Sequence, residues 1–331
     1  MFCRAAVAVL GLVLSVAVST VSLVYAQNYP AKPVRILVGF PVGGVTDIMA
    51  RIVGQKLGDS FGQQFIIDNR PGAGSAIASD IAAKAAPDGY TLSMIGTSYA
   101  VNAALQPRLP FDPLRDFAGV VMVSAAPQVL VAHAALPVKN VAGLMELARA
   151  RPGQINFASS GNGSTSHLAG ELLNMLANVR LNHVPYRSGS SGMMTDVISG
   201  RMQLLFLSLP GALPQIKAGR VRGLAVTSLK RSSAAPDVPT FVESGVAGYE
   251  ATSWNGIVVP AATIASVIAK LNAEVQRALR SADVVEAITR QGAEPFGTTP
   301  GANTPGEFDV YLRAEIAKWK KIVAASGAQN D

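Results

Sequence analysis

Short apolar runs alternate with longer amphipathic stretches along most of this chain. The apolar runs end at turns that contain Gly, Ser or Pro, which is typical of buried strands. We predict strands at 34–40, 64–68, 90–95, 155–158, 181–185, 202–207, 221–227 and 256–259. We predict helices at 75–86, 141–150, 168–177, 193–199, 213–218, 264–281, 283–291 and 306–326, with another from about residue 99. This alternation indicates an α/β fold of open, mostly parallel sheets flanked by helices.

Two long apolar stretches, 117–132 and 251–260, are interpreted as crossings between two domains. Beyond the last predicted strand the pattern contains only helices, which we expect to pack back onto the first domain. The predicted organisation is a first lobe of residues 27–124 plus 253–331 and a second lobe of residues 125–252. Ligands of such sheets bind beyond the carboxyl ends of the strands, so we predict a ligand-binding cleft between the lobes.

The N-terminal residues have the pattern of an export signal. Arg4 gives a basic start, residues 5–24 are apolar or small, and Val24-Tyr25-Ala26 has the small-x-small pattern of a cleavage site. We therefore expect residues 1–26 to be a signal peptide, with cleavage after Ala26 and a mature protein in the periplasm. The alternative is a permanent membrane anchor, because the apolar stretch is just long enough to span a bilayer.

The composition narrows the chemistry that this protein can perform. The only cysteine, Cys3, lies in the expected leader, so the mature chain has no thiol for a disulfide or a metal site. The net charge is +7, but Lys and Arg are scattered and form no basic stripe interleaved with aromatics, so we do not expect nucleic acid as a partner. The histidines show no metal-ligand spacing and no acidic pair suggests acid–base catalysis. We predict no metal, no cofactor and no catalytic residues.

Two Gly/Ser/Thr-rich loops connect an apolar strand directly to a helix. Residues 41–47 contain Gly43 and Gly44, and residues 159–167 contain five Ser or Thr residues before His167, but neither loop contains Lys or Arg. A helix N-terminus carries unpaired N–H groups and a partial positive charge, which together attract anions. We interpret both loops as cradles for a small carboxylate. The alternatives are an ordinary capped turn for the first loop and a flexible exposed loop for the second.

A third strand-to-helix junction, Gly96-Thr97-Ser98, resembles the turn that carries the nucleophile of some hydrolases. A hydrolase would also need a histidine and an acid at Ser98, and none of the three histidines lies in a motif that indicates this. We therefore favour Ser98 as a hydroxyl donor to a ligand and keep a secreted serine hydrolase as the alternative. Tyr186, at the end of another predicted strand, is expected at the cleft.

Several motifs in the same order resemble the Bug family, the extracytoplasmic solute receptors of tripartite tricarboxylate transporters. The motifs are Tyr29–Pro33, Phe40–Asp47, Asn69–Gly74, Pro87–Leu92, Gly161–Glu171, His183–Tyr186, Leu224–Ser228 and Gly292–Pro295. The resemblance implies a two-lobed periplasmic binding protein, type 2-like, that is not an enzyme. It implies a monomer that closes on a small carboxylate and presents it to the transporter's membrane subunits. A sensory role with a signalling partner is a further alternative.

Carried over by position, the resemblance also implies the ligand contacts. They are Phe40, Pro41, Val42, Gly43, Gly44, Thr46, Gly96, Thr97, Ser98, Ser159, Ser160, Gly161, Asn162, Gly163, Ser164, Thr165, Tyr186, Ser188, Leu207 and Ser208. This chain departs from the family pattern at Val42, which often is proline, and at Leu207, where many members carry an acid. An acid at that position could recognise an amino or hydroxyl group. Its loss favours a carboxylate with an apolar or aromatic remainder over an amino acid.

Overall fold

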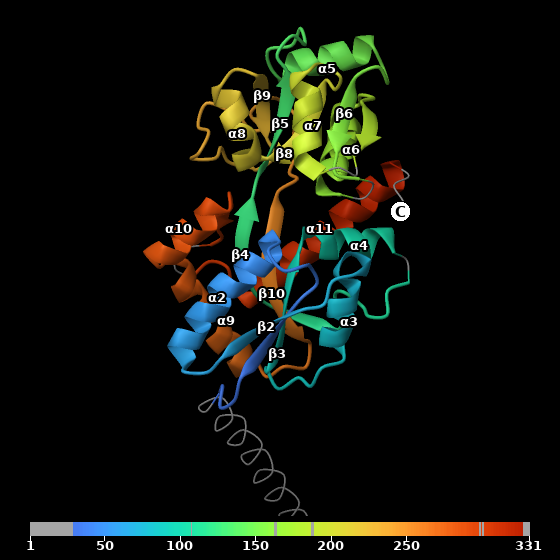
Figure 1. The fold of residues 1–331 in the computed structure, drawn as a ribbon. Helices are drawn as coiled ribbons and strands as arrows, with labels where there is room; N and C mark the ends of the chain where they lie inside the picture. The colour runs from blue at the N-terminus through green and yellow to red at the C-terminus, as the bar shows by residue number, and fades with distance from the viewer. Residues whose placement is uncertain are drawn as a thin grey trace, which may run out of the picture.

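The computed structural model describes residues 29–106, 108–161, 164–186, 189–297, 299 and 301–326. Figure 1 shows two α/β lobes, one above the other, joined by extended segments. Each lobe is built on its own sheet, so the predicted α/β class and the two-lobed architecture are confirmed. The predicted signal peptide and its cleavage site lie outside the described residues. In the described part of the chain, no helix combines the length and hydrophobicity needed to cross a bilayer.

The lower lobe in Figure 1 contains a six-stranded sheet of order β11-β4-β10-β3-β1-β2. Its strands are β1 (Val34–Val38), β2 (Phe65–Asn69), β3 (Thr91–Gly96), β4 (Phe117–Ala126), β10 (Ser253–Pro260) and β11 (Glu294–Pro295). Its helices are α2 (Val45–Phe61), α3 (Ala76–Ala83), α4 (Thr97–Leu105), α9 (Ala265–Leu279), α10 (Ala282–Arg290) and α11 (Pro305–Ser326), with a short 3-10 helix at Ala73–Ser75. We call this lobe 1.

The upper lobe, lobe 2, contains a five-stranded sheet of order β7-β6-β8-β5-β9. Its strands are β5 (Gln128–His133), β6 (Asn156–Ser159), β7 (Asn182–Pro185), β8 (Leu204–Ser208) and β9 (Val221–Val226). Its helices are α5 (Val141–Ala150), α6 (Thr165–Ala177), α7 (Gly189–Ile198) and α8 (Leu209–Lys217). The predicted elements of this region are therefore present, with small shifts at their ends.

The prediction of mostly parallel sheets is wrong, because each sheet is mixed. In lobe 1, β1 pairs parallel with β2 and β3, whereas β10 runs antiparallel to β3 and β4. In lobe 2, β6 pairs parallel with β7 and β8, whereas β5 runs antiparallel to β8 and β9. The reversed strands β5 and β10 are the ones that arrive from the other lobe. They begin at the junction between the lobes, where the neighbouring strands end, and so must run in the opposite direction.

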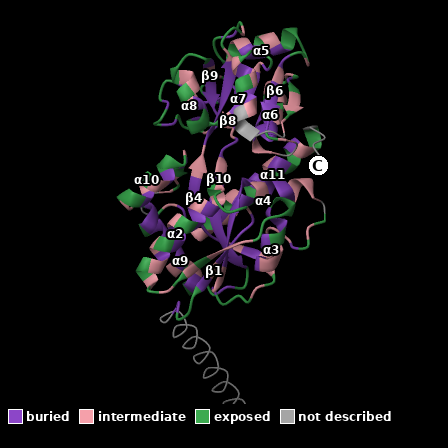
Figure 2. Cartoon of the chain, in the orientation of Figure 1, coloured by how far each residue is buried: buried purple, intermediate pink, exposed green. Residues whose placement is uncertain are grey.

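The expectation that only helices follow β10 is also wrong, since the two-residue strand β11 pairs with β4. The last helix, α11, packs against α4 and β4 of lobe 1, as predicted, but it also contacts α6 of lobe 2. Figure 2 shows that the buried residues gather on the sheets and on the inner faces of the helices. Because the strands are fixed in these cores, the described residues at their ends hold defined positions at the interlobe junction.

Candidate functional site

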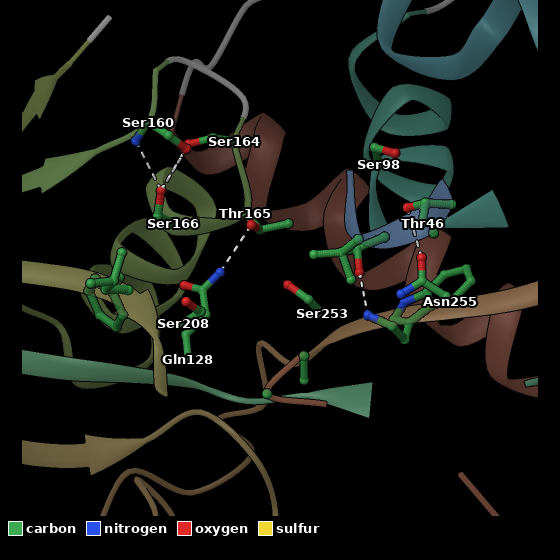
Figure 3. Close-up of a pocket in the computed structure, with 18 of the residues that line it drawn as sticks. Thr46, Ser98, Gln128, Ser160, Ser164, Thr165, Ser166, Ser208, Ser253 and Asn255 are labelled. Atoms are coloured by element: carbon green, nitrogen blue, oxygen red, sulfur yellow. Dashed lines mark hydrogen bonds between the residues drawn. The ribbon is translucent and has the colours of Figure 1, made fainter. Parts of the chain in front are cut away.

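A cavity of about 510 Å³ lies between the two lobes. It is lined by strand ends and helix starts from both lobes (Figure 3). Lobe 1 and the returning strand contribute Phe40, Val45, Thr46, Gly96, Thr97, Ser98, Val101, Ala126, Ser253, Trp254, Asn255, Gln291 and Gly292. Lobe 2 contributes Gln128, Ser160, Ser164, Thr165, Ser166, Met193, Phe206, Leu207 and Ser208. Both loops that the sequence singled out therefore face one shared cleft.

Half of the residues predicted as ligand contacts line this cavity. They are Phe40, Thr46, Gly96, Thr97, Ser98, Ser160, Ser164, Thr165, Leu207 and Ser208. The predicted contacts that do not line it are Pro41, Val42, Gly43, Gly44, Ser159, Gly161 and Tyr186. The predicted contacts Asn162, Gly163 and Ser188 lie outside the described residues. The structure thus brings the helix starts of both loops to the cavity.

Tyr186 was expected at the cleft, but its side chain is engaged elsewhere. Its hydroxyl donates a hydrogen bond to Asp196 Oδ2 of α7 at 2.6 Å. Desolvation and this hydrogen bond raise the pKa of Tyr186 to about 12. The tyrosine therefore braces α7 against the end of β7. Ser159 is likewise fully buried beneath its loop and not on the cavity wall.

The loop between β1 and α2 is held from inside by Asp47, whose side chain is 1% exposed. Its carboxylate accepts hydrogen bonds from Gly43 N at 2.9 Å and from Asn69 Nδ2 at 2.9 Å, and it forms an ion pair with Arg51. Asn69 also donates to the carbonyl of Phe40, at the cavity wall. Desolvation opposes ionisation of Asp47, but the hydrogen bonds from Arg51, Gly43 and Asn69 outweigh it and lower its pKa. Gly43 adopts a φ of 83°, a conformation that suits glycine.

We expect Asp47→Ala to lower the free energy of unfolding by about 2 kcal/mol, because it leaves several buried donors without an acceptor. Asp59→Ala is the matched control, since Asp59 is an exposed aspartate of the same helix. Its effect should stay within about 0.5 kcal/mol. Urea denaturation of the two variants measures this difference. Equal denaturation midpoints for the two variants would show that Asp47 does not hold the loop.

The start of α4 presents free donors to the cavity. Its N-cap, Gly96, provides no side-chain cap, and the first turn contains no acid. Thr97 Oγ1 accepts a hydrogen bond from Trp254 N at 2.9 Å, which fixes the helix start against β10. Ser98 Oγ is buried, yet it has no hydrogen-bond partner among the described residues. The unpaired N–H groups and this hydroxyl together form a site for an anion.

Sequence reasoning missed the cavity residues at the starts of the two arriving strands. Ser253, Trp254 and Asn255 begin β10, and Gln128 begins β5. Asn255 Oδ1 accepts a hydrogen bond from Thr46 Oγ1 at 2.8 Å, which ties β10 to the start of α2. The sequence feature that could have located these residues is the pair of apolar crossing segments, 117–132 and 251–260. A crossing strand starts at the cleft, so its first polar residues point to the ligand site.

The loop between β6 and α6 is organised by its own hydroxyl groups and by two histidines. Ser164 caps α6 by accepting a hydrogen bond from His167 N at 3.2 Å, and Ser166 Oγ accepts one from Ser160 N at 3.1 Å. The rings of His167 and His183 stack with their centroids 3.8 Å apart, and His183 Nε2 is hydrogen-bonded to Ser159 Oγ. The histidines therefore support the loop from behind. His167 therefore has a packing role in lobe 2.

All described residues that line the cavity are uncharged. Its polar groups are hydroxyls, side-chain amides and backbone, and its apolar wall is formed by Phe40, Val101, Met193, Phe206 and Trp254, among others. None of the three histidines lines it, and Ser98 has no base within hydrogen-bond distance among the described residues. This arrangement can hold an anion through dipoles. It does not provide the Ser-His-acid geometry that the hydrolase alternative requires.

Two α/β lobes are joined by crossing strands, and the described lining of the cavity between them is polar and uncharged. These features define a two-lobed solute-binding protein. The family model described as "Tripartite tricarboxylate transporter family receptor" matches residues 49–328. The chain belongs to this family, and the resemblance seen in the sequence is confirmed.

Curated relatives cover nearly the whole chain. A "UPF0065 protein in tcbD-tcbE intergenic region" of Pseudomonas sp. (strain P51) is 38% identical, over 95% of this chain and 92% of the relative. Protein BugT of Bordetella pertussis is 37% identical, over 92% of this chain and 93% of the relative.

Solved structures of similar proteins share the fold. R. palustris Rpa4515, solved with adipate, is 35% identical with a TM-score of 0.71, covering 91% of this chain and 99% of that chain. MatC of Rhodopseudomonas palustris, solved with bound malate, is 31% identical with a TM-score of 0.69, covering 89% of this chain and 100% of that chain. Family and fold thus agree on a solute-binding role.

Proposed function

We propose that this protein is a periplasmic receptor that captures a small carboxylate in the interlobe cavity and delivers it to the membrane subunits of a tripartite tricarboxylate transporter. The observation that carries the proposal is the start of α4. There an uncapped helix N-terminus and the buried hydroxyl of Ser98, which has no hydrogen-bond partner among the described residues, face a cavity whose described lining carries no charged side chain. Dipoles and hydroxyls stabilise a carboxylate there and still let it leave, which delivery requires.

The expected affinity is consistent with such a site. A helix N-terminus stabilises an anion by about 0.3–1 kcal/mol at an exposed position and by up to about 2 kcal/mol when partly buried. Hydrogen bonds to a charged group add about 1.5–3 kcal/mol each. A micromolar dissociation constant corresponds to about −8 kcal/mol, so one helix start and several hydrogen bonds are enough.

The apolar part of the cavity wall supports a carboxylate with an apolar or aromatic remainder. Phe206 and Leu207 line the cavity where many family members carry an acid next to that phenylalanine, and Met193 and Val101 add further apolar surface. The relative Rpa4515 contains adipate, which combines carboxylates with an apolar chain. We infer that the solute of this receptor combines the same two features.

The proposed function also requires that the protein be exported to the periplasm. We propose that residues 1–26 direct export and are cleaved after Ala26, and that the mature protein is a monomer that is not an enzyme. We propose lobes of residues 27–124 plus 253–331 and residues 125–252. The strand order of the two sheets supports this division, with β4 of the first lobe running on to Ala126. Closure of these lobes on the solute would exclude water from the start of α4.

Ser98→Ala is expected to weaken adipate binding about tenfold, since it removes one hydrogen bond to a charged group, worth roughly 1.5 kcal/mol. Isothermal titration calorimetry measures the loss. Ser199→Ala, an exposed serine at the end of α7, is the control and should bind adipate like the wild type. The hydrolase alternative predicts turnover of an ester such as p-nitrophenyl acetate that Ser98→Ala abolishes. Unchanged adipate affinity in Ser98→Ala would contradict the proposed site.

A further inference from the structure

Gln128 is a buried polar residue of the cavity that the proposed carboxylate site does not use. It begins β5, opposite Ser208 of β8, and its side chain is 7% exposed. Its backbone is fixed by Thr227, because Gln128 N donates to Thr227 Oγ1 at 2.8 Å and its carbonyl accepts from Thr227 N at 2.8 Å. The side chain therefore projects into the cavity from a rigid position.

One end of the Gln128 amide is engaged and the other is not. Gln128 Nε2 donates a hydrogen bond to Thr165 Oγ1 at 3.0 Å (Figure 3). Gln128 Oε1 is buried and has no hydrogen-bond partner among the described residues. A buried acceptor without a partner is unfavourable unless something fills its place, so this atom marks a subsite of the cavity.

The two ends of the cavity differ in the charge they favour. The start of α4 in lobe 1 is uncapped, whereas in lobe 2 Ser164 already caps α6. The start of α8 is poor in donors, because Leu209 N donates to the Pro127 carbonyl and Pro210 has no N–H. An anion is therefore best placed at lobe 1. The subsite at Gln128 suits a neutral polar group.

The groups at this subsite specify which neutral group fits. Gln128 Oε1 accepts a hydrogen bond, while Thr165 Oγ1, which accepts from Gln128, keeps its own hydrogen to donate. A hydroxyl group is both a donor and an acceptor and can satisfy this pair. A carboxylate can only accept, so it would face the lone pairs of Gln128 Oε1.

We propose that Gln128 is a specificity-determining residue that, together with Thr165, binds a hydroxyl group of the solute remote from its carboxylate. Ser208 lies beside them, as Figure 3 shows, and its hydroxyl does not cap α8. The preferred solute is then a hydroxy acid whose carboxylate lies at the start of α4 and whose hydroxyl lies at Gln128. This inference rests on the proposed function.

The test compares three end groups on chains of the same length. Calorimetry of the purified receptor uses the ω-hydroxy acids of four to seven carbons, each against its n-alkanoate and its dicarboxylate. At the chain length that fits, the wild type should bind the hydroxy acid about tenfold more tightly than the alkanoate, the gain of one buried hydrogen bond. Gln128→Leu should reduce that ratio to about one. Gln154→Leu, an exposed glutamine of the same lobe, should keep the wild-type ratio.

Each other result overturns the inference in a distinguishable way. If Gln128→Leu still prefers the hydroxy acid, another group of the cavity binds the hydroxyl of the solute. If the dicarboxylate binds most tightly and only Gln128→Leu loses this preference, the amide is turned over and donates to a second carboxylate. If alkanoates bind but no length shows a preference, the subsite does not exist and the proposed function stands. If no carboxylate binds, the proposed function fails as well.

Discussion

Glu315→Ala is expected to lower the free energy of unfolding by about 3–5 kcal/mol, because it removes the acceptor from a buried cluster. Glu315 is 2% exposed and accepts hydrogen bonds from Trp254 Nε1 at 2.9 Å and Trp319 Nε1 at 3.0 Å. It also forms an ion pair with Lys318, which donates to the carbonyl of Glu250 at 3.1 Å. Without Glu315, two indole N–H groups lose their acceptor, and the ammonium of Lys318 loses its nearest carboxylate. Chemical denaturation followed by tryptophan fluorescence measures the loss.

The cluster also connects α11 to the binding site, since Trp254 lines the cavity. We therefore expect Glu315→Ala to weaken solute binding as well as stability. Glu286→Ala is the matched control: Glu286 pairs with Arg290 four residues later, but its side chain is 64% exposed. Removal of this surface pair should cost no more than about 0.5 kcal/mol. Similar losses in the two variants would mean that burial of Glu315 is not what makes it important.

Acid is expected to destabilise the protein through the histidine pair behind the β6–α6 loop. Burial lowers the pKa of His167 to about 4, and burial together with the neighbouring His167 lowers the pKa of His183 to about 4. The ordinary value is about 6.5, so between pH 6.5 and 4 the unfolded chain binds protons that the folded chain does not. The free energy of unfolding must then fall as the pH falls through this window. We expect a loss of about 3 kcal/mol between pH 7 and pH 5.

Glu171 is the acidic group that faces this pair, with its Oε1 3.8 Å from His167 Nε2. Burial raises the pKa of Glu171, so its protonation favours the folded state as the pH falls. The destabilising effect of the two histidines exceeds this contribution of one carboxyl group. The double variant His167→Phe, His183→Gln keeps a ring in the stack and a hydrogen-bonding group for Ser159, yet neither residue titrates. Its unfolding free energy, measured by urea denaturation from pH 7 to pH 5, should change much less. A slope equal to that of the wild type would rule out the pair as its origin.

The sequence predicted those parts of the site that depend on local patterns. The helix starts at Thr46, Ser98 and Thr165 were found because a strand, a small-residue loop and a helix follow one another there. Their position at one cavity followed from the rule that carboxyl ends of strands share an edge. Local rules could not show that Gly43 and Gly44 do not line the cavity, because Gly43 is hydrogen-bonded to the buried Asp47.

The direction of the crossing strands and the residues at their starts depend on contacts between distant segments. Asn255 lies 209 positions from Thr46, and no local signal links the two. No local signal predicted the contact of Tyr186 either, because the packing of α7 places Asp196 within hydrogen-bond distance of its hydroxyl. The mixed sheets likewise follow from the path of the chain between lobes, which hydrophobic periodicity does not encode.

If a carboxylate binds at the start of α4, a crystal structure of the protein grown with adipate should show it there. We predict one carboxylate of adipate within about 2.5–3.2 Å of Ser98 Oγ and of N–H groups in the first turn of α4. Adipate bound instead to lysine or arginine side chains on the outer surface, with Ser98 left unoccupied, would contradict the account.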